Sequence, residues 1–430
     1  MQYFSTNRHS PLADFREATL RGQPDDLGLY FPETIPQISS EIFADLISLP
    51  NDQIAFEVIK PYVGDAIDER SLLNICKETV DCSFPLVEIS DRISTLELFH
   101  GPTLAFKDVG ARFMSRCLRY FVQDNDQKTV VIVATSGDTG GAVAAGFHGV
   151  NGIEVVILYP KGKVSRVQEL QLTTLGGNVT ALEVRGTFDD CQLLAKQALA
   201  DPKIKEKLFL TSANSINVAR WLPQQFYYFY ALKHWEGEPP VFSVPSGNFG
   251  NICAGILAHV SGMPAGGFLA ACNANTVVPD FLKTAMYRPR PSIATLSNAM
   301  DVGNPSNFVR VLEIFNNEFP RLKENLSAAS VTDEETIATM REVHDETGYT
   351  LDPHGAVGYK ALADHLTDRP GQKGIVLETA HPVKFDSVGE ILGVSVETPP
   401  SVLDLLNKEK DAMEIEADHE TVKDVILSRI

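Results

Sequence analysis

TVVIVATSGDTGGAVAAGFHGV, residues 129–150, is the stretch that decides the fold class. Its first seven residues form a run of β-branched and other apolar side chains, which is typical of a strand buried in a parallel sheet. A glycine-rich turn follows, and the stretch of small residues after it is typical of a helix. A strand that passes through such a turn into a helix predicts the first part of a right-handed βαβ unit.

The alternation of strand and helix continues along most of the chain. Apolar runs at 153–160, 178–185, 240–247, 268–273 and 374–380 predict further strands, and stretches between them predict helices. This spacing indicates an α/β protein whose sheets are mostly parallel and covered by helices on both faces. Because 430 residues exceed what one hydrophobic core usually organises, we expect two αβα sandwich domains.

The pattern also suggests where these parts begin and end. We expect an N-terminal extension over residues 1–90, a main α/β region over 91–390 and a C-terminal helical segment over 391–430. Within the main region, a smaller domain is expected at about 110–215 and a larger one at about 216–390, together with flanking segments.

The charge and composition exclude several classes of partner. A formal charge of −19 argues against general binding to nucleic acids or membrane surfaces, which are themselves anionic. The six cysteines show no CxxC spacing, so we interpret them as reduced residues and expect no metal site. The N-terminus lacks the apolar region of a secretory signal, and no run is long enough to span a membrane. We therefore expect a cytoplasmic protein.

The first candidate for chemistry is a lysine at the start of a predicted helix. The segment HGPTLAFKDVGARFM, residues 100–114, places Lys107 directly after apolar residues and before a helical periodicity. Apolar surroundings and the positive end of a helix both lower the pKa of a lysine. A neutral amine is what Schiff-base chemistry requires. A solvated surface lysine is the ordinary alternative for such a residue taken alone.

Two glycine-rich loops follow predicted strands, where open α/β sheets bind ligands. ATSGDTGGAV, residues 134–143, offers Thr135, Ser136 and a helix N-terminus that attracts anions. VPSGNFGNICAG, residues 244–255, can present successive backbone N–H groups to a phosphate monoester. The spacing in the first loop matches neither GxGxxG nor the P-loop pattern, which disfavours a dinucleotide site. A plain turn between strand and helix is the alternative for both loops.

Two further segments offer weaker signals. SANSINVARW, residues 212–221, places Asn214 and Arg220 near a helix start, where the guanidinium could bind a carboxylate or a phosphate. LETAHPVKF, residues 377–385, places the hydroxyl of Thr379 at the end of the late strand. Arg220 could equally be an ordinary arginine on a helix surface.

Together these segments resemble the threonine synthase family, whose members are fold-type II pyridoxal-phosphate (PLP) enzymes with a tryptophan synthase β-like fold. The resemblance covers nearly the whole chain, from an N-terminal extension of the family type to TAHPVKF near residue 380. It is carried by segments that occur in the family's order: LFHGPTLAFKDVGARFM, ATSGDTG, VVILYPKGKVSRVQE, TLGGNV, SANSINVAR, VPSGNFGN, TLSNAMDVGNPSN and TAHPVKF.

The resemblance implies roles for individual residues. Lys107 would hold PLP as a Schiff base and act as general acid and base, and Thr379 would bind the pyridine nitrogen. Asp138 would lie near the 3-hydroxyl of the cofactor. The cofactor phosphate would be bound by Gly247, Asn248, Phe249, Gly250 and Asn251, and the substrate would be contacted by Thr135, Ser136, Asn214, Arg220 and Asn248.

The reaction that the resemblance implies converts O-phospho-L-homoserine and water to L-threonine and phosphate, in a monomer or homodimer. Two alternatives stay open at this point. Another fold-type II enzyme, such as a threonine or serine dehydratase or a phospho-amino-acid lyase, would share the architecture. A cofactor-free regulator that binds a nucleotide or metabolite would share the doubly wound scaffold, although the missing nucleotide motifs weigh against it.

Overall fold

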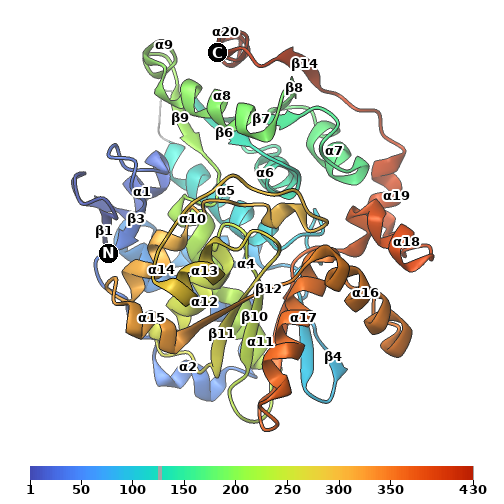
Figure 1. Cartoon of the computed structure of the whole chain (residues 1–430). Coiled ribbons are helices and arrows are strands. Elements are labelled where there is room, and N and C mark those ends of the chain that lie inside the picture. The colour runs from blue at the N-terminus through green and yellow to red at the C-terminus, as the bar shows by residue number, and fades with distance from the viewer. Residues whose placement is uncertain (124–127, 430) are drawn as a thin grey trace.

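A computed structural model describes residues 1–123 and 128–429 of the chain. Its strands form three sheets, of which two are largely parallel and belong to separate α/β units (Figure 1). The predicted α/β class is therefore confirmed, and so is the N-terminal extension that precedes these units. Within the described residues, no helix is both long and apolar enough to cross a membrane.

The smaller unit contains residues 129–150. Its sheet has the order β14-β8-β7-β6-β9, and every neighbouring pair is parallel. The strands are β6 (Thr129–Ala134), β7 (Ile153–Pro160), β8 (Val179–Arg185), β9 (Phe209–Ser212) and β14 (Met413–Glu416). All residues of β6 are buried, because the strand is paired on both edges and covered on both faces. The helices of this unit are α6 (Asp138–Phe147), α7 (Arg166–Thr173), α8 (Phe188–Ala200), α9 (Pro202–Lys205) and α20 (His419–Leu427).

The larger unit is built on a six-stranded sheet of order β12-β11-β10-β13-β5-β4, parallel except for the β4–β5 pair. Its strands are β4 (Leu86–Ser90), β5 (Ile93–Glu97), β10 (Val241–Pro245), β11 (Gly267–Cys272), β12 (Leu326–Ser330) and β13 (Gly374–Glu378). Its longer helices are α5 (Lys107–Val122), α11 (Phe226–Lys233), α12 (Gly250–Val260), α13 (Val277–Thr284), α16 (Asp333–Thr347) and α17 (Pro353–Thr367). Short helices include α10 (Val218–Trp221), α14 (Phe308–Ile314) and α15 (Phe319–Asn325), with 3-10 turns η2 (Leu222–Gln225), η3 (Asn298–Met300) and η4 (Pro382–Lys384).

The N-terminal extension contains a small antiparallel sheet of order β2-β1-β3 and several helices. These elements are β1 (Gln2–Ser5), β2 (Ala13–Asp14), β3 (Tyr30–Pro32), α1 (Phe15–Arg21), α2 (Ser40–Asp45), α3 (Asn51–Val63), η1 (Gly64–Ala66) and α4 (Glu69–Thr79). The expected end of this part at residue 90 needs correction. Strand β4 already pairs with β5 in the larger sheet, so residue 90 lies inside a hairpin.

The C-terminal segment connects the two units. Figure 1 shows it passing from α18 (Asp386–Leu392), beside α16, through α19 (Pro400–Leu406) to β14 and α20 on the smaller unit. The segment 391–430, expected to be helical, contains α19 and α20, and between them β14 adds a parallel strand to the edge of β8. Lys410 supports this docking through ion pairs with Glu169 and Glu183, at 2.7 and 2.8 Å.

Candidate active site

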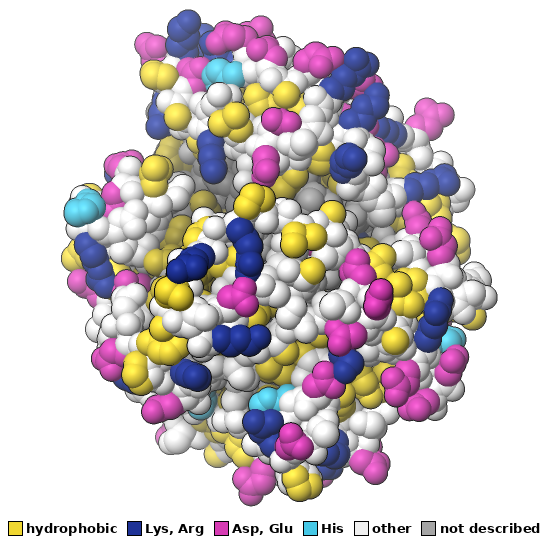
Figure 2. Space-filling view, viewed as in Figure 1, with side chains coloured by type: hydrophobic (Ala, Val, Ile, Leu, Met, Phe, Trp, Pro, Cys, Tyr) yellow, Lys and Arg dark blue, Asp and Glu magenta, His cyan; other side chains and the backbone are white. Residues whose placement is uncertain are grey.

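The carboxyl ends of several parallel strands point toward the region where the two units meet, and Figure 2 shows the surface recessed there. Strand β6 leads into the loop of Thr135, and β9 leads into the loop of Asn214. From the larger sheet, β10 leads into the loop of Gly247 and β13 leads to Thr379. The loops predicted from sequence therefore all leave strands at the end where α/β sheets bind ligands.

Lys107 and Thr379 are brought together by backbone hydrogen bonds, although 272 positions separate them. The N–H of Phe106 donates to the carbonyl oxygen of Thr379 at 2.9 Å, and the N–H of His381 donates to the carbonyl of Leu104 at 3.0 Å. A bridge between Ala105 and Ala380 completes the contact. The side-chain hydroxyl of Thr379 makes no hydrogen bond with the described residues, so it is free to accept or donate to a ligand.

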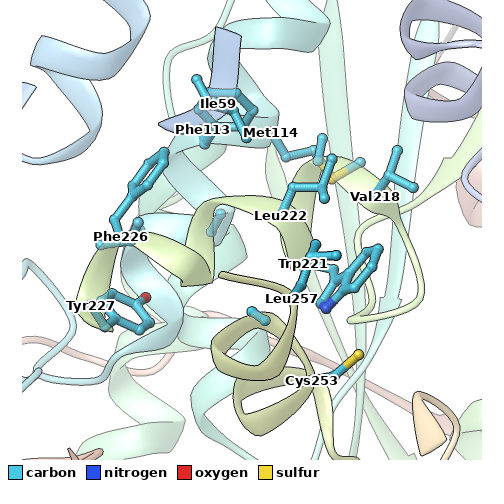
Figure 3. Close-up of a cluster of buried hydrophobic side chains, with 14 of the residues drawn as sticks. Ile59, Phe113, Met114, Val218, Trp221, Leu222, Phe226, Tyr227, Cys253 and Leu257 are labelled. Atoms are coloured by element: carbon cyan, nitrogen blue, oxygen red, sulfur yellow. The ribbon is translucent and has the colours of Figure 1, made fainter. Parts of the chain in front are cut away.

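The helix that begins at Lys107 is anchored in the main core. Helix α5 is buried along most of its length, and Figure 3 shows side chains from α5, α10, η2, α11 and α12 packed in one cluster that includes Phe113, Met114, Trp221, Phe226 and Cys253. The hydroxyl of Tyr227, from the same cluster, donates to the carbonyl oxygen of Phe106. The residue before Lys107 is therefore held from two sides.

The predicted low pKa of Lys107 is confirmed in direction. Part of the side chain is still exposed, but the surrounding protein desolvates the amino group, and this burial is the largest cause of the lowered pKa. The nearby charge of Asp138 raises the pKa of Lys107, whereas the charges of Lys384 and Arg220 lower it further. A larger fraction of Lys107 is therefore in the neutral amine form than for a solvated lysine. Nucleophilic chemistry requires that neutral form.

Asp138 is the first residue of α6 and pairs with a lysine that the sequence reasoning did not single out. Its Oδ1 lies 2.7 Å from Nζ of Lys384 and accepts from Nε2 of Gln168 at 2.9 Å. Both partners are buried, and the nearby positive charges of Lys384 and Lys107 hold the pKa of Asp138 below its usual range despite the burial. Lys384 also donates to the carbonyl of Thr103 at 2.6 Å. The only sequence signal for Lys384 was its place six residues beyond the end of β13.

The loop between β10 and α12 has the geometry of a phosphate cradle. Phe249 adopts a left-handed conformation, with φ of 62°, so that the chain turns sharply into α12. Within the described part of the chain, no protein group accepts from the backbone N–H groups of 247–251. Several free N–H groups at the positive end of a helix are suited to a doubly charged phosphate.

The side chains of this loop face elsewhere. Asn251 is buried, and its Oδ1 accepts from the hydroxyl of Tyr228 at 3.0 Å. Asn248 is exposed, and its Oδ1 accepts from the hydroxyl of Ser306 at 3.1 Å. The backbone N–H groups of this loop, and not its asparagine side chains, are therefore available to bind a cofactor phosphate.

Gly247 is required by a close approach of backbone. A Cβ at this position would lie 2.8 Å from Cα of Met300 and 2.9 Å from the carbonyl oxygen of Ala299. We expect Gly247→Ala to push the loop away from the turn 299–300 and to raise the dissociation constant for PLP at least about tenfold. Titration of the apoprotein with PLP measures this. Gly371→Ala is the matched control, because nothing lies within 4 Å of its Cβ; equal effects of the two changes would contradict the role of Gly247.

Arg220 is a buried cation without an acidic partner among the described residues. Its residue is 4% exposed, its NH1 group donates to the carbonyl of Ala213, and its Nε–H has no acceptor. Burial lowers the pKa of Arg220 to about 10, and it is still charged at neutral pH. A buried guanidinium with a free N–H is costly unless an anion binds to it, so the geometry favours a carboxylate or phosphate ligand.

The other predicted substrate residues divide into two kinds. Ser136 and Asn214 are half-buried on loops beside these groups, which is compatible with substrate contact. The hydroxyl of Thr135 accepts from the N–H groups of Gly137 and Gly140 at 3.0 and 2.9 Å and donates to the carbonyl of Gly137. Thr135 therefore shapes the turn through its hydroxyl, and its contact with the substrate stays a prediction.

A second set of residues missed by sequence reasoning connects the loops to the N-terminal extension. The guanidinium of Arg310 is fully buried and donates to the carbonyls of Tyr30 and Ile216 and to Oδ1 of Asn307, at 2.6 to 3.1 Å. The N–H of Asn307 donates to the carbonyl of Asn248 at 3.1 Å. Arg310 thus holds the extension, the substrate loop and the phosphate loop in one arrangement.

These features fit one kind of cofactor. A lysine with a lowered pKa can bind an aldehyde covalently, a row of free N–H groups can hold a phosphate, and the free hydroxyl of Thr379 can bind a ring nitrogen. Pyridoxal phosphate carries an aldehyde, a phosphate and a pyridine nitrogen. The residues present therefore fit PLP at each of its polar ends.

Comparison with known proteins agrees with this geometry. The family "Pyridoxal-phosphate dependent enzyme" matches residues 93–378, "Threonine synthase N terminus" matches 2–80, and "Threonine synthase, C-terminal" matches 355–426. The threonine synthase of Escherichia coli is 43% identical over 93% of both chains, and that of Haemophilus influenzae is 41% identical over 96% of this chain and 97% of its own.

Solved structures of relatives share the whole architecture. The crystal structure of threonine synthase from Escherichia coli has a TM-score of 0.92 at 40% identity and covers 100% of both chains. A PLP-bound threonine synthase from Brucella melitensis has a TM-score of 0.92 at 33% identity, covering 99% of this chain and 98% of its own. With matches over nearly its full length to both sequences and structures, the chain belongs to the threonine synthase family of PLP-dependent enzymes.

Proposed function

We propose that this enzyme converts O-phospho-L-homoserine and water to L-threonine and phosphate, with PLP bound covalently to Lys107. The likeness to threonine synthases over more than nine-tenths of the chain supports the reaction. The observation that carries the site assignment is the group of Lys107, Thr379 and the free N–H groups of 247–251, which matches the polar ends of the cofactor. PLP supplies an electron sink that stabilises negative charge next to the substrate nitrogen.

Lys107 is assigned to proton transfer. With PLP bound, the neutral amino group of Lys107 would take the proton from Cα of the substrate and later return one. Burial, the largest cause of its lowered pKa, keeps a share of this amine neutral at physiological pH. The fixed position at the start of α5 keeps Nζ on one side of the site.

We assign Arg220 and the loop amides to the binding of anions. In the overall reaction the C–O bond at Cγ breaks and phosphate leaves, Cβ loses a proton, Cγ gains one, and the hydroxyl of water is added at Cβ. We assign Arg220 to an anionic group of the substrate, because none of the described acidic residues forms an ion pair with it and its Nε–H has no acceptor. Ser136 and Asn214 are assigned to the same substrate.

Thr379 and Asp138 are assigned to the cofactor ring. A hydroxyl at the pyridine nitrogen does not force that nitrogen to be protonated, in contrast to a carboxylate. Asp138 is held in its ionised form by Lys384, at 2.7 Å, and is assigned to the 3-hydroxyl side. Thr135 is assigned to the shape of this loop, since its hydroxyl bonds only to the backbone of Gly137 and Gly140.

The decisive experiment incubates the PLP-loaded enzyme with O-phospho-L-homoserine and measures threonine and phosphate together. We expect the two products in equal amounts. Formation of 2-oxobutyrate in place of threonine would instead favour a dehydratase or lyase, the alternative within the same fold. Absence of the visible absorbance of lysine-bound PLP, even after the cofactor is added, would contradict the assignment of the site.

The substrate is a small molecule, as for the other members of the family. We further propose a cytoplasmic enzyme that acts as a monomer or homodimer and does not bind nucleic acid. The formal charge of −19 supports the last point, because nucleic acids repel a strongly acidic protein.

A further inference from the structure

A chain of buried polar groups runs behind the cofactor site and belongs to none of the residues assigned so far. Glu378 ends strand β13, directly before Thr379, and Asp352 and His354 lie at the start of helix α17. Their exposed fractions are 0%, 0% and 3%. Three titratable side chains buried this completely require an explanation, because burial without partners is costly.

The hydrogen bonds of these three residues point in one direction. The N–H of Asp352 donates to Oε1 of Glu378 at 3.0 Å, and Oδ1 of Asp352 lies 2.5 Å from Nδ1 of His354. At the other side of the imidazole, Nε2 accepts from the N–H of Ala299 at 3.2 Å. Because Nε2 accepts from a backbone amide, the network assigns the ring proton to Nδ1, which donates to Asp352.

The carboxyl groups of Asp352 and Glu378 each have one oxygen without a hydrogen-bond donor in the described part of the chain. Oδ2 of Asp352 and Oε2 of Glu378 are both buried and have no donor among the described residues. Burial raises the pKa of Glu378 well above its usual range, and the neighbouring carboxylates of Asp352 and Glu97 raise it further. Protonation of Glu378 removes its buried negative charge and gives this carboxyl group a donor.

The His354 end of this hydrogen-bond network reaches the turn against which the phosphate loop packs. Ala299 belongs to the turn η3, and its carbonyl oxygen and Cα of Met300 are the atoms that a Cβ on Gly247 would meet. Through the Ala299 N–H, His354 therefore fixes the turn 299–300, against which the phosphate loop packs. The near end, Glu378, is covalently joined to Thr379.

We infer that Glu378, Asp352 and His354 are positioning residues that hold the phosphate loop and Thr379 at the spacing that PLP requires. The inference rests on the proposed cofactor site. The three residues contact the turn 299–300 and the backbone before Thr379. They therefore act on cofactor affinity and not on the proton transfers of the reaction. A merely structural role would lower stability without changing the surroundings of the bound phosphate.

The test removes the contact to Ala299 from both sides. His354→Asn keeps an amide that can donate to Asp352 but lacks the Nε2 acceptor, and Ala299→Pro removes the donor N–H at a half-buried turn position. We expect each variant to raise the dissociation constant for PLP about fivefold to tenfold, since one hydrogen bond that positions the loop is lost. The ³¹P resonance of the bound cofactor should also shift, while kcat at saturating PLP stays within about threefold.

Two comparisons complete the design. Glu378→Gln is neutral and can donate to Asp352 as the protonated acid does, so we expect its PLP affinity to stay within about twofold of the unmodified enzyme. His365→Asn, on the same helix α17, controls for changes in that helix and should leave PLP binding unchanged.

Unchanged PLP affinity and an unchanged ³¹P signal in both His354→Asn and Ala299→Pro would overturn the inference. A tenfold loss of affinity in Glu378→Gln would overturn the protonated form of Glu378. The two deciding readouts, PLP affinity and the ³¹P signal, are independent of whether the enzyme forms threonine. A failure of the proposed reaction in the unmodified enzyme is therefore distinguishable from a failure of this inference.

Discussion

Lys107→Ala abolishes turnover, by about 10⁴-fold or more, and removes the visible absorbance of lysine-bound PLP. The substitution takes away the covalent attachment point and the general base together, and proton transfer by a positioned side chain alone contributes about 10²- to 10⁴-fold. Because the amino group of Lys107 is desolvated, its removal is not expected to unfold the protein. Steady-state kinetics with O-phospho-L-homoserine and absorbance spectra of the purified variant measure the two effects.

Lys107→Arg separates charge from nucleophilicity. Arginine keeps a cation at the start of α5 but is not deprotonated in proteins, so we expect the same loss of activity and of absorbance. Circular dichroism and thermal unfolding show whether both variants keep the fold. Activity of either variant near that of the unmodified enzyme would remove Lys107 from the chemistry.

The second large effect is expected for Arg220→Gln, which should lower kcat/KM for O-phospho-L-homoserine by about 10²- to 10³-fold. The substitution leaves an anionic group of the substrate buried without its cation, which typically costs about 2–5 kcal/mol. Glutamine retains a donor but loses the charge. PLP affinity should change little, because the cofactor phosphate is assigned to the backbone of 247–251.

Arg119→Gln is the matched control on the neighbouring helix α5. Arg119 is about half exposed and pairs with Glu78 on the surface, so its removal should leave kcat/KM within about twofold. Steady-state kinetics of both variants, with PLP titrations beside them, make the comparison. If Arg220→Gln instead weakened PLP and left KM for the substrate unchanged, the guanidinium would belong to the cofactor phosphate.

Much of the fold was predictable because several strands carry their signal locally. The runs at 129–135, 153–160 and 374–380 became β6, β7 and β13 with boundaries within about two residues. Their side chains are apolar on both faces, which a parallel strand covered by helices requires. Helix α1 also carries its signal locally, since Asp14 caps its start and Gly22, with φ of 73°, ends it.

Strands with weaker patterns were missed. β12 is made of Leu326 followed by small residues, and β14 alternates methionine and isoleucine with glutamate, which resembles an amphipathic surface segment. Both are strands because a neighbour supplies the pairing: β11 for β12 and β8 for β14. Backbone hydrogen bonds between residues at distant positions of the chain leave no periodic mark in either strand.

For the site, the sequence alone determined the types of group and their places at strand ends: Lys107 at a helix start, the glycine loop around 247 and the hydroxyl of Thr379. Only the tertiary structure decided which charges meet. It paired Asp138 with Lys384, left Arg220 without an acid and buried Glu378 beside Asp352. The reason is physical: desolvation and Coulomb interactions depend on the atoms within a few ångströms, and the chain brings those atoms from distant positions.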